Sequence, residues 1–418
     1  MSAGAAPVPN SLPPHHLVTH AVVTGMTGSG KTGLLTVLIE EPLRSSVPVL
    51  IVDVKGDLPD LLFRFPRGNP QVFVPWIDTN APQYEGRPVD EIANRLYRDR
   101  EAGLDLSGIY PDAIESYRQT TSIRLLTPGS TAGEPIHLLS SLERRSPVWD
   151  TDPETARNPL ANTISLVLRL LGRDSDPAAS KDHVLLSVLA EKRLREGRTA
   201  DLASLIQDIE DPPIEQVGAM AFDRLLCKTE RQKLAASLNA LLASPTFETW
   251  RCGVSLDVAE WLKPSNGKTP AVIVSVAHLD DQERASVLGV ILEEVNGYVR
   301  GLPETSALRS LIVFDEVYGY LPPHPSNPPT KRPLVALMKQ ARAFGVGVVV
   351  ATQNPMDLDY RALSDAGLWF VGRLQTDADR ERVVEGMSGA SDKEETQDLD
   401  KTIKHLSNRW FLQRSVYQ

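Results

Sequence analysis

The sequence predicts an α/β protein with a mostly parallel, doubly wound sheet, into which an all-helical subdomain is inserted. Short apolar runs alternate with helical segments in the first and last thirds of the chain, whereas helical periodicity alone fills the middle. Such alternation is typical of parallel sheets, because each crossover must return the chain to the same end of the sheet. We therefore expect a flexible lead-in at 1–20, a first core part at 21–155, a helical insertion at 156–265 and a second core part at 270–418.

Composition and charge narrow the class of protein. Hydrophobic residues make up 41% of the 418 residues, and no apolar run approaches the ~20 residues that cross a bilayer, so we expect no membrane contact and a cytoplasmic location. The net charge is −10, so any contact with nucleic acid must be local. Cys227 and Cys252 match no metal-ligand spacing, and the histidines form no cluster, so no metal other than Mg²⁺ is indicated.

The first core part contains four apolar runs that read as strands, with helices between them. A glycine-rich turn separates the first strand from the first helix, and a proline–glycine turn closes the last strand. The expected strands are 21–24, 49–54, 71–74 and 122–126, and the expected helices are 33–40 and 88–100.

The rest of the chain divides into a helical and a mixed region. The insertion is expected to hold helices at 160–171, 183–195, 202–209 and 231–242, without a strand between them. The second core part is expected to add strands at 271–276, 310–314, 346–351, 368–372 and 409–413. Six prolines lie in 321–333, a density that excludes helix and strand and predicts a loop.

The most informative stretch is Gly25-Met-Thr-Gly-Ser-Gly-Lys-Thr32, which fits the phosphate-binding pattern GxxxxGK[ST] between a strand and a helix. Glycines let backbone N–H groups curl around phosphates, the lysine reaches the β- and γ-phosphate oxygens, and the hydroxyl can ligate Mg²⁺. The sequence therefore predicts binding of ATP with Mg²⁺. The expected nucleotide-binding residues are Gly25, Thr27, Gly28, Ser29, Gly30, Lys31, Thr32 and Gly33.

Two later strands end in side chains suited to hydrolysis. Asp315 and Glu316 follow four apolar residues, so Asp315 is expected to hold Mg²⁺ through water and Glu316 to orient or deprotonate the attacking water. Gln353 ends the next strand and is expected to sense the γ-phosphate or the water. The carboxyl ends of neighbouring parallel strands meet in one crevice, which also receives Asp53.

Basic residues supply candidates for two further roles. Arg342 or Arg373 is expected to neutralise charge on the transferred phosphoryl group, from the same or a neighbouring subunit. Most basic clusters read as solvated helix faces. The cluster that begins at Lys331 and Arg332, in the proline-rich loop after Glu316, is the best candidate for DNA phosphates and for a pore.

Several of these motifs together resemble the HerA/FtsK branch of P-loop ATPases, especially HerA-like ATPases. The resemblance takes in 25–32, 314–316, 339–345, 351–355 and 367–373. It implies a RecA-like core, a homo-hexameric ring with ATP at the subunit interfaces, and double-stranded DNA moved through the pore. By position, Lys31 and Thr32 match the first motif of this family, Asp315 and Glu316 the second, Gln353 the sensor, and Arg342 the arginine that acts on the neighbouring subunit.

The expected function is that of a Mg²⁺-ATP hydrolysing ring motor, a DNA translocase or helicase, within a repair or antiviral defence complex. An ATP-gated scaffold that recruits an effector nuclease and turns over slowly is the alternative, and DNA-stimulated hydrolysis would separate the two. A conjugative coupling motor is disfavoured because no apolar run is long enough to span a membrane, and an ABC-type ATPase because no LSGGQ-like signature precedes Asp315. The phosphate loop begins at residue 25, which leaves no room for the small N-terminal β-barrel of HerA, and the chain ends soon after 409–413 as if truncated.

Overall fold

The protein is built on one eight-stranded sheet, seen in a computed structural model that describes residues 11–415 except 85, 147–148, 178, 364–365 and 389–392. The strand order is β12-β11-β1-β10-β9-β2-β8-β3. Every neighbouring pair in this sheet is parallel except β11 and β12, which are antiparallel. The expected mostly parallel α/β fold is confirmed.

Apolar sequence and burial agree along the strands. The six inner strands are buried at every residue, as expected for strands covered by helices on both faces, whereas the edge strands β3 and β12 are partly exposed. The strands are β1 Ala21–Thr24, β2 Val49–Asp53, β3 Thr121–Leu126, β8 Thr269–Ser275, β9 Ser310–Asp315, β10 Val346–Thr352, β11 Leu368–Val371 and β12 Leu412–Ser415.

Helices cover the two faces of the sheet unequally. One face packs against α1 (Pro14–Leu17) and α2 (Lys31–Arg44), whose buried leucines and Ile39 meet the strands in one apolar cluster. The other face packs against α13 (Asp281–Arg300) and α14 (Lys331–Gln340) in a larger cluster. This larger cluster continues into the helices inserted before α13. The elements near the C-terminus are η5 Ala341–Phe344, η6 Pro355–Asp357, α15 Tyr360–Leu363, α16 Asp377–Ser388 and α17 Lys393–Lys404.

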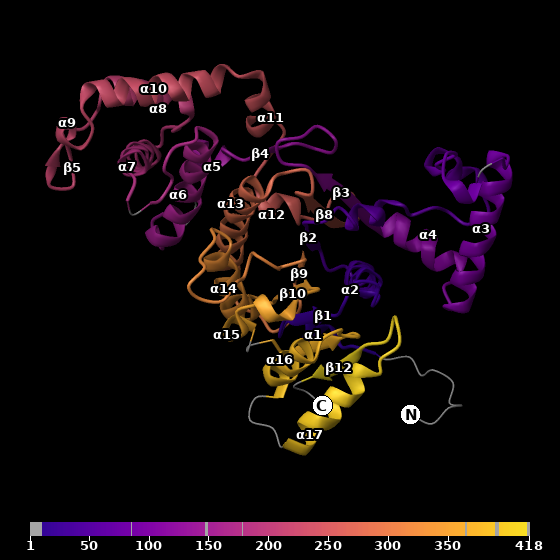
Figure 1. Cartoon of the computed structure of the whole chain (residues 1–418). Helices are drawn as coiled ribbons and strands as arrows, with labels where there is room; N and C mark the ends of the chain where they lie inside the picture. Colours follow the sequence, from indigo (N-terminus) through magenta and orange to yellow (C-terminus); the bar gives the residue numbers. More distant parts are fainter. Residues whose placement is uncertain are drawn as a thin grey trace.

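The helices of the middle region project from one side of the sheet, and we call them the helical extension (residues 140–262; Figure 1). Two short parallel strands, β4 (Ile136–His137) and β7 (Val254–Ser255), pair where the chain leaves the core and returns. A two-residue hairpin, β5 (Gln216–Val217) with β6 (Met220–Ala221), interrupts the helices, although no strand was expected there. The helices are α5 Ser140–Glu143, α6 Pro153–Leu170, α7 Lys181–Arg195, α8 Leu202–Glu210, α9 Phe222–Leu225, α10 Lys228–Ala243, η4 Pro245–Phe247, α11 Glu248–Arg251 and α12 Val258–Trp261.

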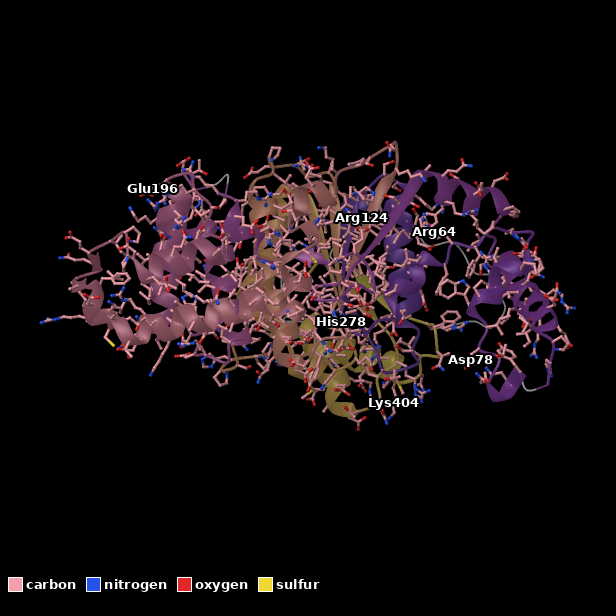
Figure 2. All side chains as sticks on the ribbon, turned by 90° about the horizontal axis from the view of Figure 1, so that it is seen from above. Arg64, Asp78, Arg124, Glu196, His278 and Lys404 are labelled. Carbon is pink, nitrogen blue, oxygen red and sulfur yellow. The ribbon has the colours of Figure 1, made fainter. Side chains whose placement is uncertain are left out.

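A second projection, which we call the arm (residues 58–120), leaves the opposite side of the sheet (Figure 1). Figure 2 shows the two projections from above, with Glu196 of the helical extension and Asp78 of the arm at opposite ends of the molecule. The arm consists of η1 Leu58–Leu62, η2 Pro70–Trp76, η3 Pro82–Tyr84, α3 Val89–Leu106 and α4 Pro111–Thr120. The expected strand at 71–74 is wrong: these residues lie in η2, where Pro70 and Pro75 fix φ and Asn69 caps the first turn.

Three other expected segments have different bounds in the structure. The lead-in is shorter than 20 residues, because Pro14–Leu17 is helical and Leu17 to His20 are buried; residues 1–10 lie outside the described part. The proline-rich run gives way to α14 at Lys331, since Pro333 falls in the first turn, where its missing N–H costs nothing. The last strand begins at Leu412 and runs antiparallel.

A span through a membrane requires a long apolar helix. Among the described residues, no helix has the length and hydropathy for this.

Candidate nucleotide-binding site

The carboxyl ends of four neighbouring strands place the predicted chemical residues at one edge of the sheet. Thr24 of β1 is in register with Thr352 of β10, and Asp53 of β2 is in register with Asp315 of β9. The loops that follow these strands must therefore emerge side by side. They carry Lys31, Lys55, Glu316 and Gln353, although up to about three hundred residues separate them along the chain.

The phosphate loop leads from β1 directly into α2. Gly28 and Gly30 have φ of +77° and +99°, a region that side chains with a Cβ rarely adopt. A Cβ on Gly30 would also lie 3.1 Å from Arg409 Cα. Helix α2 begins at Lys31, so its free N–H groups and the positive end of its dipole face the loop.

Lys31 folds back over this loop. Its ammonium donates hydrogen bonds to the carbonyl oxygens of Gly25, at 2.5 Å, and Met26, at 3.2 Å. Burial, with a smaller contribution from the charge of Lys55, lowers the pKa of Lys31 to about 8 against the opposing effect of Glu316. Because only neutral carbonyl oxygens bind this ammonium, its positive charge remains available to bind an anion.

The two acids behind β9 have different surroundings. Asp315 is buried and has no hydrogen-bond or ion-pair partner in the described part of the chain, and burial raises its pKa to about 6. Glu316 adopts a φ of +59°, which turns its carboxylate toward the end of β10. There its Oε1 accepts hydrogen bonds from Thr352 Oγ1, at 3.1 Å, and from the N–H of Gln353, at 3.2 Å.

Gln353 connects the end of β10 with the phosphate loop. The hydroxyl of Thr27 donates a hydrogen bond of 2.6 Å to Gln353 Oε1. Thr32 and Gly33, on the first turn of α2, border a cavity of about 670 Å³ between α2 and the arm. The structure thus brings Thr27, Lys31, Glu316 and Gln353 to the same edge as Asp315.

The two candidate arginines lie at opposite edges. Arg373 lies two residues after the end of β11, and its carbonyl oxygen accepts a 2.8 Å hydrogen bond from the N–H of Met26 in the phosphate loop. Arg342 lies in η5, before β10, at the amino edge of the sheet. There it is exposed, and its charge adds to burial in lowering the pKa of His20 to about 4. A strand rises ~3.3 Å per residue, so at least the four residues of β1 separate Arg342 from its own phosphate loop.

Two residues at the site were missed by sequence reasoning. Lys55 forms an ion pair with Glu316 Oε2. Its position two residues after the strand that ends at Asp53 was a usable signal. Arg409, in the loop before β12, donates a 2.8 Å hydrogen bond from its N–H to Ser29 O, a contact that no local pattern announces.

The buried carboxylate of Asp53 stabilises the turn that follows β2. Its carboxylate accepts hydrogen bonds from Ser275 Oγ and from the N–H of Gly56, both at 2.9 Å. Burial nevertheless raises its pKa. These bonds fix the turn that carries Lys55.

The residues present fit a magnesium nucleotide better than a metal held by protein alone. Within the described residues, no group of three or more His, Cys, Asp and Glu side chains is placed to hold a metal ion. Mg²⁺ usually takes one or two protein oxygens and completes its shell with phosphates and water. The unpartnered carboxyl of Asp315 and the hydroxyl of Thr32 suit that arrangement.

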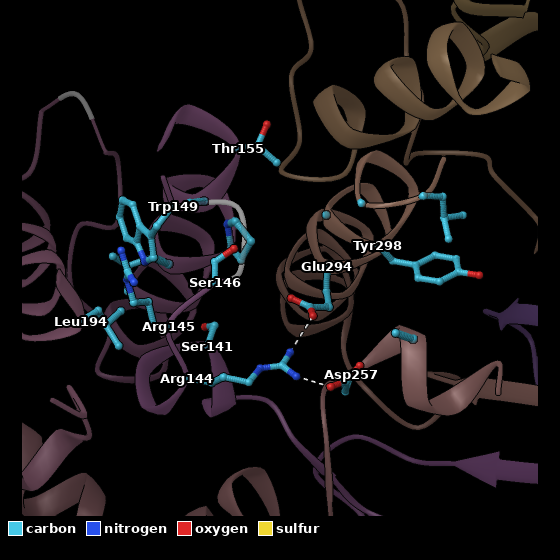
Figure 3. A pocket seen from close by; sticks show the side chains of 17 residues that line it. Ser141, Arg144, Arg145, Ser146, Trp149, Thr155, Leu194, Asp257, Glu294 and Tyr298 are labelled. Atoms are coloured by element: carbon cyan, nitrogen blue, oxygen red, sulfur yellow. Dashed lines mark hydrogen bonds and ion pairs between the residues drawn. The ribbon is translucent and has the colours of Figure 1, made fainter. Parts of the chain in front are cut away.

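Basic clusters elsewhere are largely neutralised within the chain. A cavity of about 480 Å³ lies between the helical extension and α13. Figure 3 shows Arg144 in this cavity between Asp257 and Glu294. Arg144 forms ion pairs with both, at 2.9 Å for Glu294. Arg145 pairs with Asp150 at 2.6 Å. Burial raises the pKa of Glu294 to about 7, against the lowering effect of Arg144.

Comparison with known proteins identifies similarities in the phosphate-loop segment and in the fold. Residues 6–67 match the family model described as Helicase HerA-like C-terminal. VirB4 of Thermoanaerobacter pseudethanolicus shares the fold: the match covers 96% of this chain and 87% of that one, at 13% identity and a TM-score of 0.53.

Weaker structural matches include plasmid coupling protein TrwB in complex with a non-hydrolysable ATP analogue (18% identity, 94% and 81% coverage, TM-score 0.47). TrwB in complex with ADP and Mg²⁺ also matches (16% identity, 97% and 80% coverage, TM-score 0.45). No curated protein sequence matches the chain. The resemblance stated from the motifs is thus confirmed at the level that these comparisons reach: the chain shares its fold with VirB4, and its phosphate-loop segment matches the HerA-like C-terminal family model.

Proposed function

We propose that this chain is a Mg²⁺-dependent ATPase of the HerA/FtsK type that works as a homo-hexameric motor on double-stranded DNA. The observation that carries the proposal is the meeting of Lys31, Asp315, Glu316 and Gln353 at one edge of the sheet, beside a phosphate loop that opens a helix. This combination supplies an anion cradle, a cation-binding acid and a base within one crevice.

Each residue has a role in the proposed hydrolysis. Backbone N–H groups of the loop and the Lys31 ammonium bind the β- and γ-phosphates. Thr32 and Asp315 would hold Mg²⁺, which would supply positive charge beside the phosphate oxygens when bound. Glu316 takes the proton of the attacking water as the water oxygen bonds to the γ-phosphorus and the bond to the ADP oxygen breaks.

The orientation of Glu316 favours this role. Thr352 and the N–H of Gln353 fix its Oε1, so the carboxylate cannot turn freely. A base that is already oriented loses less entropy when it meets the water.

The hydrolytic part of the proposal is tested by Glu316→Gln, which keeps the shape of the side chain and removes the base. We expect ATP binding to persist and hydrolysis to fall by about 10² or more. Glu260→Gln, at an exposed carboxylate paired with Lys263, is the matched control and should hydrolyse at the parental rate. Parental hydrolysis by Glu316→Gln would remove Glu316 from the mechanism.

The ring is supported by the place of Arg342. Its guanidinium is exposed at the amino edge and forms no hydrogen bond or ion pair with other described residues, so it is free to approach the phosphate loop of a neighbouring subunit. Arg342→Ala should then bind ATP yet hydrolyse it poorly, because the lost contact exists mainly in the transition state.

Mixing two inactive variants tests this arrangement. Lys31→Ala subunits retain Arg342, and Arg342→Ala subunits retain the phosphate loop, so mixed rings should recover part of the activity. Subunit exchange is followed independently, by fluorescence transfer between labelled copies. Exchange without recovered activity would assign the arginine to the same chain, with Arg373 the first candidate.

The DNA contact is proposed at Arg332, since the two basic residues at the start of α14, Lys331 and Arg332, differ in their surroundings. Lys331 is 14% exposed and pairs with Asp359 at 3.2 Å, whereas Arg332 is 62% exposed and lies 3.7 Å from Glu154. Arg332→Ala should weaken DNA binding and reduce its salt dependence.

The alternative function is an ATP-gated scaffold for an effector nuclease. Hydrolysis by the parent protein that does not respond to DNA would favour this scaffold over a translocase.

A further inference from the structure

Lys55 holds one oxygen of the proposed base. Its ammonium forms an ion pair with Glu316 Oε2, while Thr352 and the N–H of Gln353 occupy Oε1. Both oxygens of the Glu316 carboxylate are therefore engaged. Oε2 must lose the Lys55 ammonium before it can accept a hydrogen bond from a water held by that oxygen alone.

Lys55 also belongs electrostatically to the phosphate site. Its charge lowers the pKa of Lys31 and opposes the rise in the pKa of Asp315, so all three groups lie within reach of one another's fields. Two ammonium groups thus lie near one another at the carboxyl edge of the sheet, and one of them is bound to Glu316. A γ-phosphate placed there carries more negative charge than one carboxylate and competes with it for the ammonium.

The backbone of Lys55 is fixed while its side chain can move. Gly56 follows at a φ of +88°, and its N–H is bonded to buried Asp53. The Lys55 side chain is 32% exposed and carries its charge on a flexible four-carbon stem. A change of partner requires only side-chain rotation.

We propose that Lys55 is an ATP-responsive residue that exchanges Glu316 for the γ-phosphate of ATP and thereby frees Glu316 Oε2 for the attacking water. The inference rests on the proposed function and extends it. Lys55 then contacts the substrate and also gates the base. Because ADP has no γ-phosphate, this exchange distinguishes ATP from ADP.

The test is made in the Glu316→Gln background, where the neutral side chain removes the ion pair and hydrolysis does not disturb the binding equilibrium. The affinities of Mg²⁺-ATP and Mg²⁺-ADP are measured by calorimetry with and without Lys55→Met. Loss of a charged hydrogen bond should weaken ATP binding about 10- to 100-fold and change ADP binding by less than about twofold. Lys263→Met, at an exposed lysine, is the matched control and should change neither affinity.

A lysine that only neutralises Glu316 gives a different result. If Lys55 had only this role, Lys55→Met in the Glu316→Gln background would leave the ratio of ATP to ADP affinity unchanged. That outcome overturns the inference. Retained ADP binding in Lys55→Met shows that the phosphate loop is folded, and equal loss of both nucleotides would also count against a γ-phosphate contact. If the Glu316→Gln parent binds neither nucleotide, the proposed function itself fails.

Discussion

The helical extension and the carboxyl edge of the sheet both bury charge, but they compensate it differently. In the extension, Arg193 and Asp208 are 11% and 9% exposed, and their two hydrogen bonds include one of 2.7 Å from Nη2 to Oδ1. Arg193 also donates to the carbonyl oxygens of Thr199 and Ser204. At the edge, Asp315 has no partner among the described residues, and Lys31 is bonded to carbonyl oxygens alone.

This difference separates structural charge from functional charge. A buried ion that is fully hydrogen-bonded needs nothing more, whereas a buried ion without partners costs free energy until a ligand supplies them. The pKa values follow the same division, since burial raises that of Asp315 to about 6 and lowers that of Lys31 to about 8, whereas the bond to Asp208 raises that of Arg193. The edge is therefore the place where a charged ligand gains most.

The largest expected effect lies in the extension. Arg193→Ala leaves Asp208 buried without its partner and should lower the free energy of unfolding by about 3 to 5 kcal/mol. Arg157→Ala removes a more exposed pair, in which Arg157 is 49% and Glu191 24% exposed, and should cost less than about 1 kcal/mol. Urea unfolding measures both. Equal losses would show that burial does not distinguish the two pairs, and the ATP affinity of both variants should match that of the parent.

At the carboxyl edge of the sheet, removal of a buried charge is expected to raise the free energy of unfolding instead of lowering it. The folded-state pKa of Asp315 is raised from 3.8 to about 6, so its contribution favours the fold at low pH and is lost as the pH rises through about 6. At pH 7 Asp315→Asn should therefore stabilise the protein by about 1 to 2 kcal/mol while it abolishes Mg²⁺-dependent hydrolysis. Urea unfolding at pH 7 and pH 4 tests this, because the gain should shrink at the lower pH. A loss of stability at pH 7 would show that Asp315 has a structural partner.

A smaller effect is expected from pH alone. Mg²⁺-ATP binding needs Asp315 ionised and Lys31 protonated, so affinity should fall below about pH 6 and above about pH 8. Each limb should approach tenfold per pH unit. Titration in Asp315→Asn should lack the acidic limb, and an acidic limb that persists in this variant would assign it to another group.

Much of this arrangement could be predicted because it is local in sequence. The phosphate loop and the acids after β9 each lie at the end of an apolar run, and parallel strands bring such ends together. The predicted strand at 71–74 failed because its apolar letters lie between Pro70 and Pro75, and prolines outweigh β propensity. The last strand was expected at 409–413 but begins at Leu412, and nothing local indicates that Leu412–Ser415 runs antiparallel to β11.

The parts of the site that sequence did not predict are contacts between distant loops. Lys55 reaches Glu316 across 261 positions, and the choice of partner depends on the order of β9 and β2 in the sheet. Arg409 reaches Ser29 through the turn before the antiparallel strand, which was itself misplaced. Sequence patterns thus predict which residues lie at the carboxyl edge of the sheet, but they do not predict which of these residues contact one another.

The central claim is that the uncompensated charges at the carboxyl edge form a site for Mg²⁺-ATP, and calorimetric titration of the nucleotide tests it most directly. The parent chain should bind one Mg²⁺-ATP per chain, and Lys31→Ala should weaken this binding at least about 100-fold, since the ammonium is the charge that the loop directs at the phosphates. Lys263→Met, the exposed control, should bind like the parent. Equal affinity in the parent and Lys31→Ala, or no binding by the parent, would contradict the account.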